Sequence, residues 1–397
     1  MPSRRQVLAG AGVAGAGWLG WNWSQLSATD TYYDGQDPPD TEWWPQPRFD
    51  RMGTCFNPRQ VGPREGVRER WSVDVGGPSA RPVVADGTAY FPTAGGLLAL
   101  DARSGEERWR VDRDQPRSMW PYDAVFHDGL LYVASGDDPS LLALDAESGD
   151  REWTFHPDSF SVTALLVDPR RPTLFAGDYE GNVYGLDPAT GEVRWESEVF
   201  GVVTQFALGI PGLAVGTEAG EVHALYPDDG RHLWRRKLPG RVRALATANG
   251  RGVFAGVFGG PTVELDTSRA GGTTWRSDRW TSDSFALAGN TLFTTGGRLT
   301  ALDVRGGDRR WTGGRTTQCG PAMAGDTVYA ASETDVSGYA FRGGVGVGPL
   351  RVGAKRWSHP VEGRPEQGFA VADDALFFMT EGGGEETRSK AYALESA

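Results

Sequence analysis

An eleven-residue phrase that returns through most of the chain is the feature that most constrains its fold. The phrase reads ALDARSGEERW at 99–109 and ALDAESGDREW at 143–153. Three later copies keep its eleven residues, one has an added residue and one has a long insertion. In chain order the copies end at Trp109, Trp153, Trp195, Trp234, Trp275, Trp311 and Trp357. Counted from Trp71, the tryptophan spacings are 38, 44, 42, 39, 41, 36 and 46 residues. This period is close to the roughly 40 to 45 residues of a four-stranded propeller blade.

Each repeat also reads as four short strands. In the first repeat we expect strands over 81–85, 88–92, 97–101 and 106–111, with a turn at Asp86-Gly87 between the first two. Asp and Gly tolerate the positive φ angles that tight hairpins require. The sequence therefore predicts an all-β fold, a β-propeller of four-stranded antiparallel blades.

The phrase itself is explained by scaffold roles. The Asp in its third place can accept backbone N–H groups across the following turn, and the Gly takes the left-handed position that closes the hairpin. The Trp on the outer strand is expected to cover the seam between blades. We assign these structural roles to the eight tryptophans, Trp71 included, and to Asp101, Asp145, Asp187, Asp266 and Asp303.

The ends of the chain predict the number of blades. After Trp357, residues 358–397 supply three strands and finish in AYALESA, where the phrase stops before its turn and its Trp. Residues 66–71 (GVRERW) have the form of the missing half. We therefore predict an eight-bladed ring over 43–397 whose last blade is closed by the N-terminal strand. Closure of this kind removes exposed sheet edges.

The phrase A-x-D-x-x-[ST]-G-x-x-x-W resembles the signature of pyrroloquinoline-quinone (PQQ)-like propeller repeats. The segment at 43–54 (WWPQPRFDRMGT) is similar to the one that precedes the repeats in exported members. The resemblance covers about 43–397. It implies the fold, and it leaves the function open, because such repeats occur in quinone-dependent alcohol and glucose dehydrogenases, in the non-catalytic assembly lipoprotein BamB and in sensor domains of kinases.

Two functions follow from the resemblance. The first is a non-catalytic binding scaffold, similar to BamB, for which no cofactor is expected. The second is a PQQ-dependent dehydrogenase of alcohols or sugars, in which the quinone would sit on the channel axis with calcium and a carboxylate base. The alcohol dehydrogenases of this type carry two adjacent cysteines, and this chain has no Cys-Cys pair. We therefore favour the scaffold and keep the dehydrogenase as the alternative.

Composition excludes some partners. With 52 acidic residues against 40 Lys plus Arg, the formal net charge of -12 argues against nucleic-acid binding. The acidic balance and the preference for arginine are of a halophilic type. Cys55 and Cys319 either form one bridge or stay as two buried thiols, and neither lies in a metal-binding pattern. No catalytic residue and no metal site are predicted.

The N-terminus has the form of an export signal. Ser3-Arg4-Arg5 precedes a weakly apolar stretch that ends near Trp21, as in a twin-arginine signal. We expect a signal or an uncleaved anchor over 1–28 and an acidic flexible linker over 29–42. The protein would then lie at the cell surface, or in the periplasm where the cell has an outer membrane, with membrane contact only through this segment.

Two connections between blades carry extra aromatic residues and are candidates for a partner surface. They lie at 111–122 and 276–284. Trp and Arg are common anchors of protein interfaces. The candidate residues, for an unknown protein or small ligand, are Arg117, Trp120, Tyr122, Arg279 and Trp280; local packing at the blade junctions is the alternative. We expect a monomer.

Overall fold

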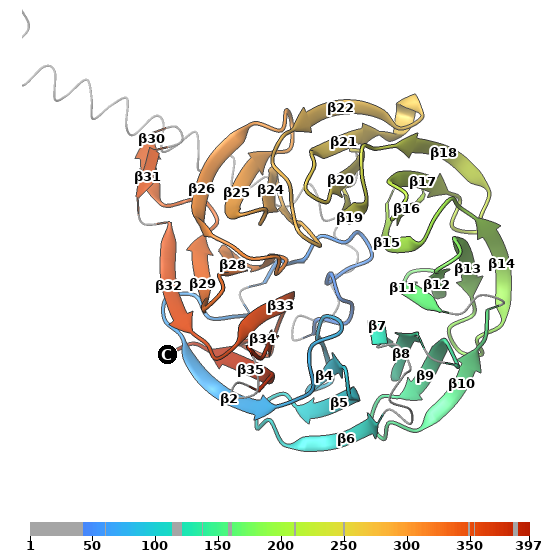
Figure 1. Ribbon diagram of the computed structural model, residues 1–397, viewed down its shortest axis with the longest axis horizontal. Coiled ribbons are helices and arrows are strands. Elements are labelled where there is room, and N and C mark those ends of the chain that lie inside the picture. The colour runs from blue at the N-terminus through green and yellow to red at the C-terminus, as the bar shows by residue number, and fades with distance from the viewer. Residues whose placement is uncertain are drawn as a thin grey trace, which may run out of the picture.

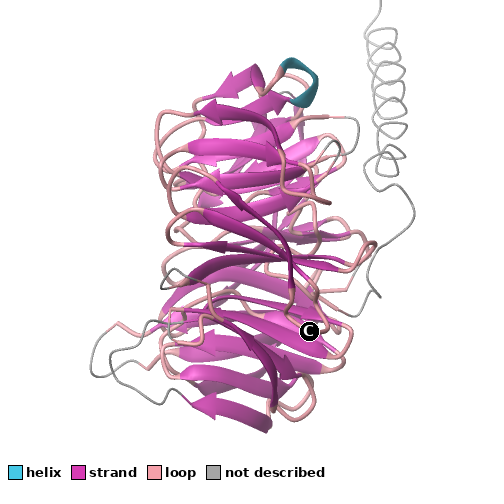
Figure 2. Ribbon diagram, turned by 90° about the vertical axis from the view of Figure 1, so that its right-hand side faces the viewer, coloured by secondary structure: helices cyan, strands magenta, loops and turns pink. Residues whose placement is uncertain are grey.

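The computed structural model describes residues 43–59, 61–112, 121–136, 138–157, 161–209, 212–248, 251–347, 350–352, 354–383 and 388–397. Eight antiparallel sheets radiate from a common axis, as Figure 1 shows in the view down that axis. Seen edge-on in Figure 2, the ring is a disc with turns on both faces. The predicted all-β, eight-bladed propeller is confirmed.

Each blade runs from the axis outward. In the order of their innermost strands, the first four blades are β3 (Val83–Ala85), β4 (Thr88–Thr93), β5 (Gly96–Asp101) and β6 (Glu107–Asp112); β7 (Pro121–His127), β8 (Leu130–Ser135), β9 (Leu141–Asp145) and β10 (Arg151–Phe155); β11 (Val162–Asp168), β12 (Thr173–Asp178), β13 (Asn182–Leu186) and β14 (Val193–Glu198); and β15 (Val203–Leu208), β16 (Leu213–Thr217), β17 (Glu221–Leu225) and β18 (His232–Lys237).

The second half of the ring has the same order. Its blades are β19 (Val242–Thr247), β20 (Val253–Val257), β21 (Thr262–Asp266) and β22 (Gly272–Ser277); β23 (Ala286–Ala288), β24 (Thr291–Thr294), β25 (Arg298–Asp303) and β26 (Arg309–Arg315); β27 (Ala322–Ala324), β28 (Thr327–Ala331), β29 (Asp335–Ala340) and β32 (Lys355–Pro360); and β33 (Arg364–Ala372), β34 (Ala375–Glu381), β35 (Lys390–Glu395) and β2 (Arg68–Asp74). A short 3₁₀ helix, η2 (Thr267–Arg269), follows β21, and β30 (Val345–Val347) with β31 (Leu350–Val352) forms a hairpin between β29 and β32.

The eighth blade joins the two ends of the ring. β2 pairs antiparallel with β35, so that Trp71 lies opposite Ala393. Glu395 stands at the place of the repeat's Asp, and its Oε2 accepts from Nε of Arg70 at 2.7 Å. The Arg108 and Asp101 pair of the first blade, also 2.7 Å apart, occupies the same place in the phrase. The closing strand therefore reproduces the polar pairing of an ordinary blade.

The repeat's aspartates stabilise the turn between the third and fourth strands. Asp101 Oδ1 accepts the backbone N–H of Arg103 at 3.0 Å and of Ser104 at 2.8 Å. Asp145 makes the same two bonds in the next blade, to Glu147 and Ser148. Asp187, Asp266 and Asp303 each accept the N–H two residues further on. The predicted turn role is confirmed in all five blades.

The repeat's tryptophans join each blade to the next. The Trp109 indole N–H donates at 3.1 Å to the carbonyl of Ala146, which follows the turn aspartate of the next blade. Corresponding bonds of 2.7 to 3.2 Å link Trp71 to Ala102, Trp153 to Pro188, Trp195 to Pro227, Trp275 to Val304, and Trp311 to Phe341. Trp357 donates instead to Pro63, at 3.1 Å. The Trp234 indole nitrogen has no hydrogen-bond partner among the described residues, but its ring lies against Gly271 of the next blade's turn.

A segment ahead of the ring fills its axis, and we call residues 44–57 the axial segment. It is the blue trace that crosses the middle of the ring in Figure 1. Its backbone or side chains bond to the innermost strands of seven blades in chain order, at Val84, Phe126, Val167, Leu208, Thr247, Leu287 and Met323. It ends as β1 (Phe56–Asn57), which adds to β27 as a parallel strand. The axial segment thereby provides hydrogen-bond partners for backbone groups on the strand edges that face the axis.

The contact between tryptophan and turn predicts a difference between two glycines of the second blade. Gly149 and Gly129 have nearly equal φ angles of 78° and 79°. A Cβ on Gly149 would lie 2.7 Å from the Trp109 ring, whereas nothing lies within 4 Å of a Cβ on Gly129. Both Gly→Ala changes cost the backbone strain of a positive φ, about 1 kcal/mol. Gly149→Ala should cost about 1–3 kcal/mol more, as overpacking does.

Urea unfolding of the two variants measures this difference. The Gly129→Ala variant is the control for backbone strain alone. Equal losses of unfolding free energy in both variants would contradict the proposed seam contact.

Candidate functional site

Charged side chains from several blades meet at the axis. Arg81, which precedes β3, is only 5% exposed. Its Nη2 donates to Ser284 Oγ at 2.8 Å, and its Nη1 donates to Cys55 Sγ at 3.6 Å. A Cβ on Gly368 would lie 2.8 Å from the Arg81 guanidinium carbon. Arg81 therefore packs against the axial segment, the connection before the sixth blade and the innermost strand β33 of the eighth blade.

Arg48 of the axial segment and two aspartates complete this axial charge cluster. Asp123 of β7 is buried, and its Oδ2 accepts the N–H of Leu165 at 3.1 Å. Burial raises the pKa of Asp123 to about 6, although Arg48 acts to lower it. Burial also raises the pKa of Asp283 and lowers the pKa of Arg48. Two arginines thus face two aspartates whose ionisation is unfavourable without them.

A third buried carboxyl group shapes the axial segment itself. Asp50 Oδ1 accepts the N–H groups of Met52 and Thr54, and its Oδ2 accepts from the Thr54 hydroxyl at 2.8 Å. Burial nevertheless raises the pKa of Asp50 to about 6. These bonds fix the turn from which Arg51 and Met52 reach the fourth and fifth blades through their carbonyl groups.

The two cysteines are separate thiols. Cys55 and Cys319 are both free and fully buried. Burial raises the pKa of each thiol above its ordinary value. Because the thiolate is the reactive form, neither cysteine has the environment of a nucleophile. Of the two states left open by the sequence, the structure has the unpaired one.

The predicted partner residues do not gather at one point of the described structure. Arg117 and Trp120 lie outside the described residues. Tyr122 is half-buried and packs against the core between the second and third blades. Arg279 is exposed, and the half-buried Trp280 contacts Phe258 edge-to-face with ring centroids 6.2 Å apart. A partner role for these residues stays a prediction.

The structure shows further exposed aromatic residues on one face of the ring. One side of the ring holds the connections between blades and the turns between the second and third strands of each blade. We call this side the crossover face. Tyr179, Phe200 and Phe258 occupy such connections and are 56%, 66% and 44% exposed. Each of these aromatic residues lies in a turn or connection outside the repeated phrase. Their position there is the sequence signal by which they could have been added to the predicted surface.

The predicted export signal and linker, 1–28 and 29–42 with Ser3, Arg4 and Arg5, lie outside the described residues. Within the described part of the chain, no helix has the length and apolar character needed to cross a membrane.

Comparison with known proteins identifies the family. A family model described as outer membrane protein assembly factor BamB matches residues 59–205 and 201–397. The chain therefore belongs to this family of PQQ-like β-propellers.

Individual relatives include both enzymes and BamB. Quinoprotein alcohol dehydrogenase PedH of Pseudomonas putida is 26% identical over 232 residues, which are 54% of this chain and 31% of PedH. The matched part spans less than a third of the curated relatives' lengths. Quinohemoprotein alcohol dehydrogenase ADHIIG of Pseudomonas putida HK5 superposes with a TM-score of 0.71 at 14% identity, over 93% of this chain and 81% of that one. BamB of Moraxella catarrhalis superposes with a TM-score of 0.64 at 15% identity, over 83% of this chain and 97% of that one. At these identities the superpositions show the fold alone.

The axial residues do not fit a quinone held with calcium. The axial segment and Arg81 occupy the middle of the ring, and the buried carboxyl groups there accept backbone N–H groups: Asp50 from Met52 and Thr54, and Asp123 from Leu165. Among the described residues, no group of three or more His, Cys, Asp or Glu side chains could hold a metal ion. Calcium prefers six to eight oxygen ligands, which this cluster of arginines and thiols does not supply.

The raised pKa of Asp123 predicts a pH dependence of stability. Between the ordinary value of 3.8 and about 6, the folded protein binds more protons at this carboxyl than the unfolded chain does. Its contribution to the unfolding free energy should therefore rise by up to about 3 kcal/mol as the pH falls through this window. Asp123→Asn, which keeps an acceptor for Leu165, should remove that contribution.

The measurement is urea unfolding at several values between pH 4 and pH 7. Asp229→Asn is the control, because the neighbouring Arg231 lowers the pKa of that exposed carboxyl instead. An unchanged slope of stability against pH in Asp123→Asn would contradict the assignment.

Proposed function

We propose that this protein is a non-catalytic binding scaffold of the PQQ-like propeller family, exported by the twin-arginine route and active outside the cytoplasm. The observation that carries the proposal is the axial segment. The chain's own residues 44–57 bond to seven innermost strands and fill the middle of the ring. In the dehydrogenase alternative this space would receive the quinone.

The composition of the axis supports the same proposal. Asp123 is buried at the axis and Asp283 lies near it, and Arg48 and Arg81 act on both carboxyl groups. The arginines act to lower the pKa of each carboxyl group, but burial outweighs them, and the pKa of Asp123 is raised to about 6. The two cysteines are buried single thiols and do not form the adjacent pair found in alcohol dehydrogenases of this type.

Quinone loading tests the proposal against the dehydrogenase alternative. Purified protein is incubated with PQQ and calcium, desalted, and examined by absorbance and mass spectrometry, with dye-linked oxidation of alcohols and sugars assayed in parallel. We expect no stoichiometric quinone and no turnover. A quinoprotein dehydrogenase stripped and reloaded in the same way is the positive control. One retained quinone per chain with turnover would overturn the proposal.

The crossover face is the proposed partner surface. Phe258 and Trp280 contact each other there, and the Arg243 guanidinium lies 5.7 Å from the centre of the Phe258 ring. An exposed aromatic group beside arginine is a common composition of interface anchors. The predicted residue Arg279 is next to Trp280 in sequence, and Arg117, Trp120 and Tyr122 belong to the predicted connection at 111–122.

Cross-linking on whole cells tests the surface. A photo-reactive residue at Phe200 or Phe258 should capture a defined partner, and Trp280→Ala should reduce capture about tenfold or more, as loss of an interface anchor does. Val345, which is 83% exposed on the opposite side of the ring, provides the control position. Equal capture from Val345, or capture that Trp280→Ala leaves unchanged, would contradict the assignment.

A further inference from the structure

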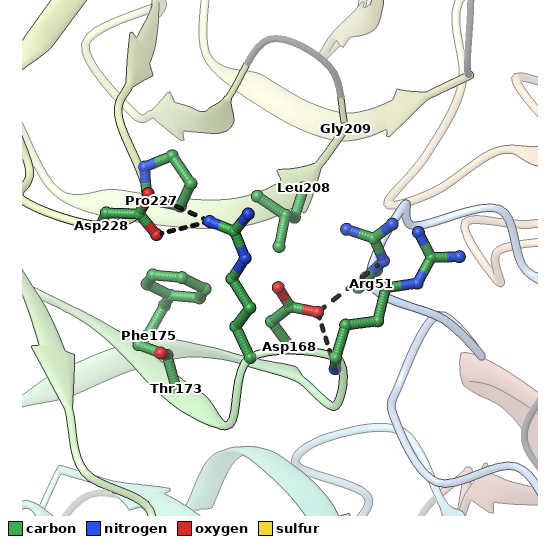
Figure 3. Close-up of a pocket in the computed structure, with 10 residues that line it drawn as sticks. Arg51, Asp168, Thr173, Phe175, Leu208, Gly209, Pro227 and Asp228 are labelled. Carbon is green, nitrogen blue, oxygen red and sulfur yellow. Dashed lines mark hydrogen bonds and ion pairs between the residues drawn. The ribbon is translucent and has the colours of Figure 1, made fainter. Parts of the chain in front are cut away.

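A charged pocket opens between the third and fourth blades, on the face opposite the crossover face. Its volume is about 260 Å³. The turn after β11, the end of β15 and the turn after β17 form its walls, and Arg51 of the axial segment reaches it from the axis (Figure 3). The pocket therefore joins three parts of the chain that are far apart in sequence.

Basic groups outnumber acidic groups in this pocket. Arg51, Arg170 and Arg171 line it together with two carboxylates, Asp168 and Asp228. The local net charge is therefore positive, although the whole chain carries -12. A positive recess in an acidic protein attracts anions by its local field.

Arg51 has donors to offer to a ligand. Its side chain is 17% exposed, and its Nε lies 3.9 Å from Asp168 Oδ1, which is too far for a hydrogen bond. Within the described residues, the Arg51 guanidinium donates no hydrogen bond. Figure 3 shows Arg51 beside Asp168 at the edge of the pocket. A planar guanidinium presents paired N–H groups that match the two oxygens of a carboxylate or phosphate.

Arg171 can also turn to a ligand at little cost. Its Nη1 donates to both oxygens of Asp228, at 3.0 and 3.1 Å. The two side chains are 72% and 69% exposed, and such surface ion pairs contribute about 0–1 kcal/mol. An anion between Arg51 and Arg171 could therefore replace the Asp228 contact without a large loss.

The backbone holds these arginines in place before any ligand binds. The Leu208 N–H donates to the Arg51 carbonyl, at 2.6 Å. Asp168 Oδ1 accepts the Arg170 N–H at 3.1 Å, which fixes the turn that carries Arg170 and Arg171. The site is therefore built from anchored backbone, and only side-chain ends need to move.

Apolar groups limit the size and shape of the ligand. Phe175, Leu208 and Pro227 line the pocket beside the arginines. The volume is below the roughly 300–1,000 Å³ of pockets for drug-sized molecules. We propose that this pocket binds a small oxyanion, a carboxylate or phosphate group on a compact body, through Arg51 and Arg171. This site does not depend on the scaffold proposal and would exist under either proposed function.

Ligand-observed NMR tests the pocket, with benzoate as the carboxylate probe and inorganic phosphate as the phosphate probe. The ionic strength is held constant with sodium chloride. We expect at least one probe to bind saturably with a dissociation constant in the millimolar range or below, about 4 kcal/mol of binding free energy. Arg51→Met should weaken that binding about tenfold or more. Arg51→Lys, which keeps the charge without the planar fork, should weaken it less.

Arg231→Met is the matched control. Arg231 is 71% exposed and pairs with Asp229 at 2.7 Å, on the same turn as Asp228 but outside the pocket lining. Its loss should leave binding unchanged. Each variant is first shown to unfold in urea at the wild-type midpoint, and Arg171→Met replaces Arg51→Met if the latter does not. The proposal is overturned if neither probe binds saturably, or if the arginine variants in the pocket bind as the wild type and the control do.

Discussion

Strands that surround the axis of a ring leave one edge without a neighbouring strand, and the backbone groups on that edge need partners when they are buried. In this protein the partner is the chain itself. Carbonyl groups of Arg51, Met52, Thr54 and Cys55 accept N–H groups from four successive blades, at 2.6 to 2.9 Å. The axial segment thus contributes to the structure of every blade it meets, and it determines what else the axis can hold.

The second requirement is that the blades join one another at a constant interval. The tryptophans of six outer strands donate their indole N–H to a carbonyl at the next blade's turn, as Trp109 does to Ala146. An aspartate such as Asp145 stabilises that turn by accepting its backbone N–H groups. Because these groups recur in register, most seams share the same contact. The pairing of Arg70 with Glu395 extends that geometry across the junction of the two ends.

The scaffold could be predicted from the sequence because its contacts repeat. The Trp, Asp and Gly positions recur at a near-constant spacing, and residues 66–71 and 391–395 show two halves of one copy. The strand predicted over 88–92 forms at Thr88–Thr93. Each of these elements depends on a local pattern that a single chain displays several times.

The candidate sites could not be predicted in the same way. The axial segment meets each blade through one or two bonds, mostly of the backbone, which leave no periodic pattern in its side chains. Arg81, Asp123 and Asp283 come from three different connections or strands outside the phrase, and only ring closure brings them together. Arg51 and Arg171 are 120 residues apart and meet only because the axial segment passes the third and fourth blades. The sequence shows that the connections contain aromatic residues, but it does not show which of these side chains are exposed.

Hydrogen exchange of the intact protein tests the central claim most directly. The amides of Leu208, Thr247, Leu287 and Met323 donate to the axial segment and not to a neighbouring strand at that edge. If the axial segment fills the axis, these four amides should exchange as slowly as amides in the middle strands of the same blades, since both would open only with the sheet. Rapid exchange at these four positions, with slow exchange in the middle strands, would show an open axis and contradict the account.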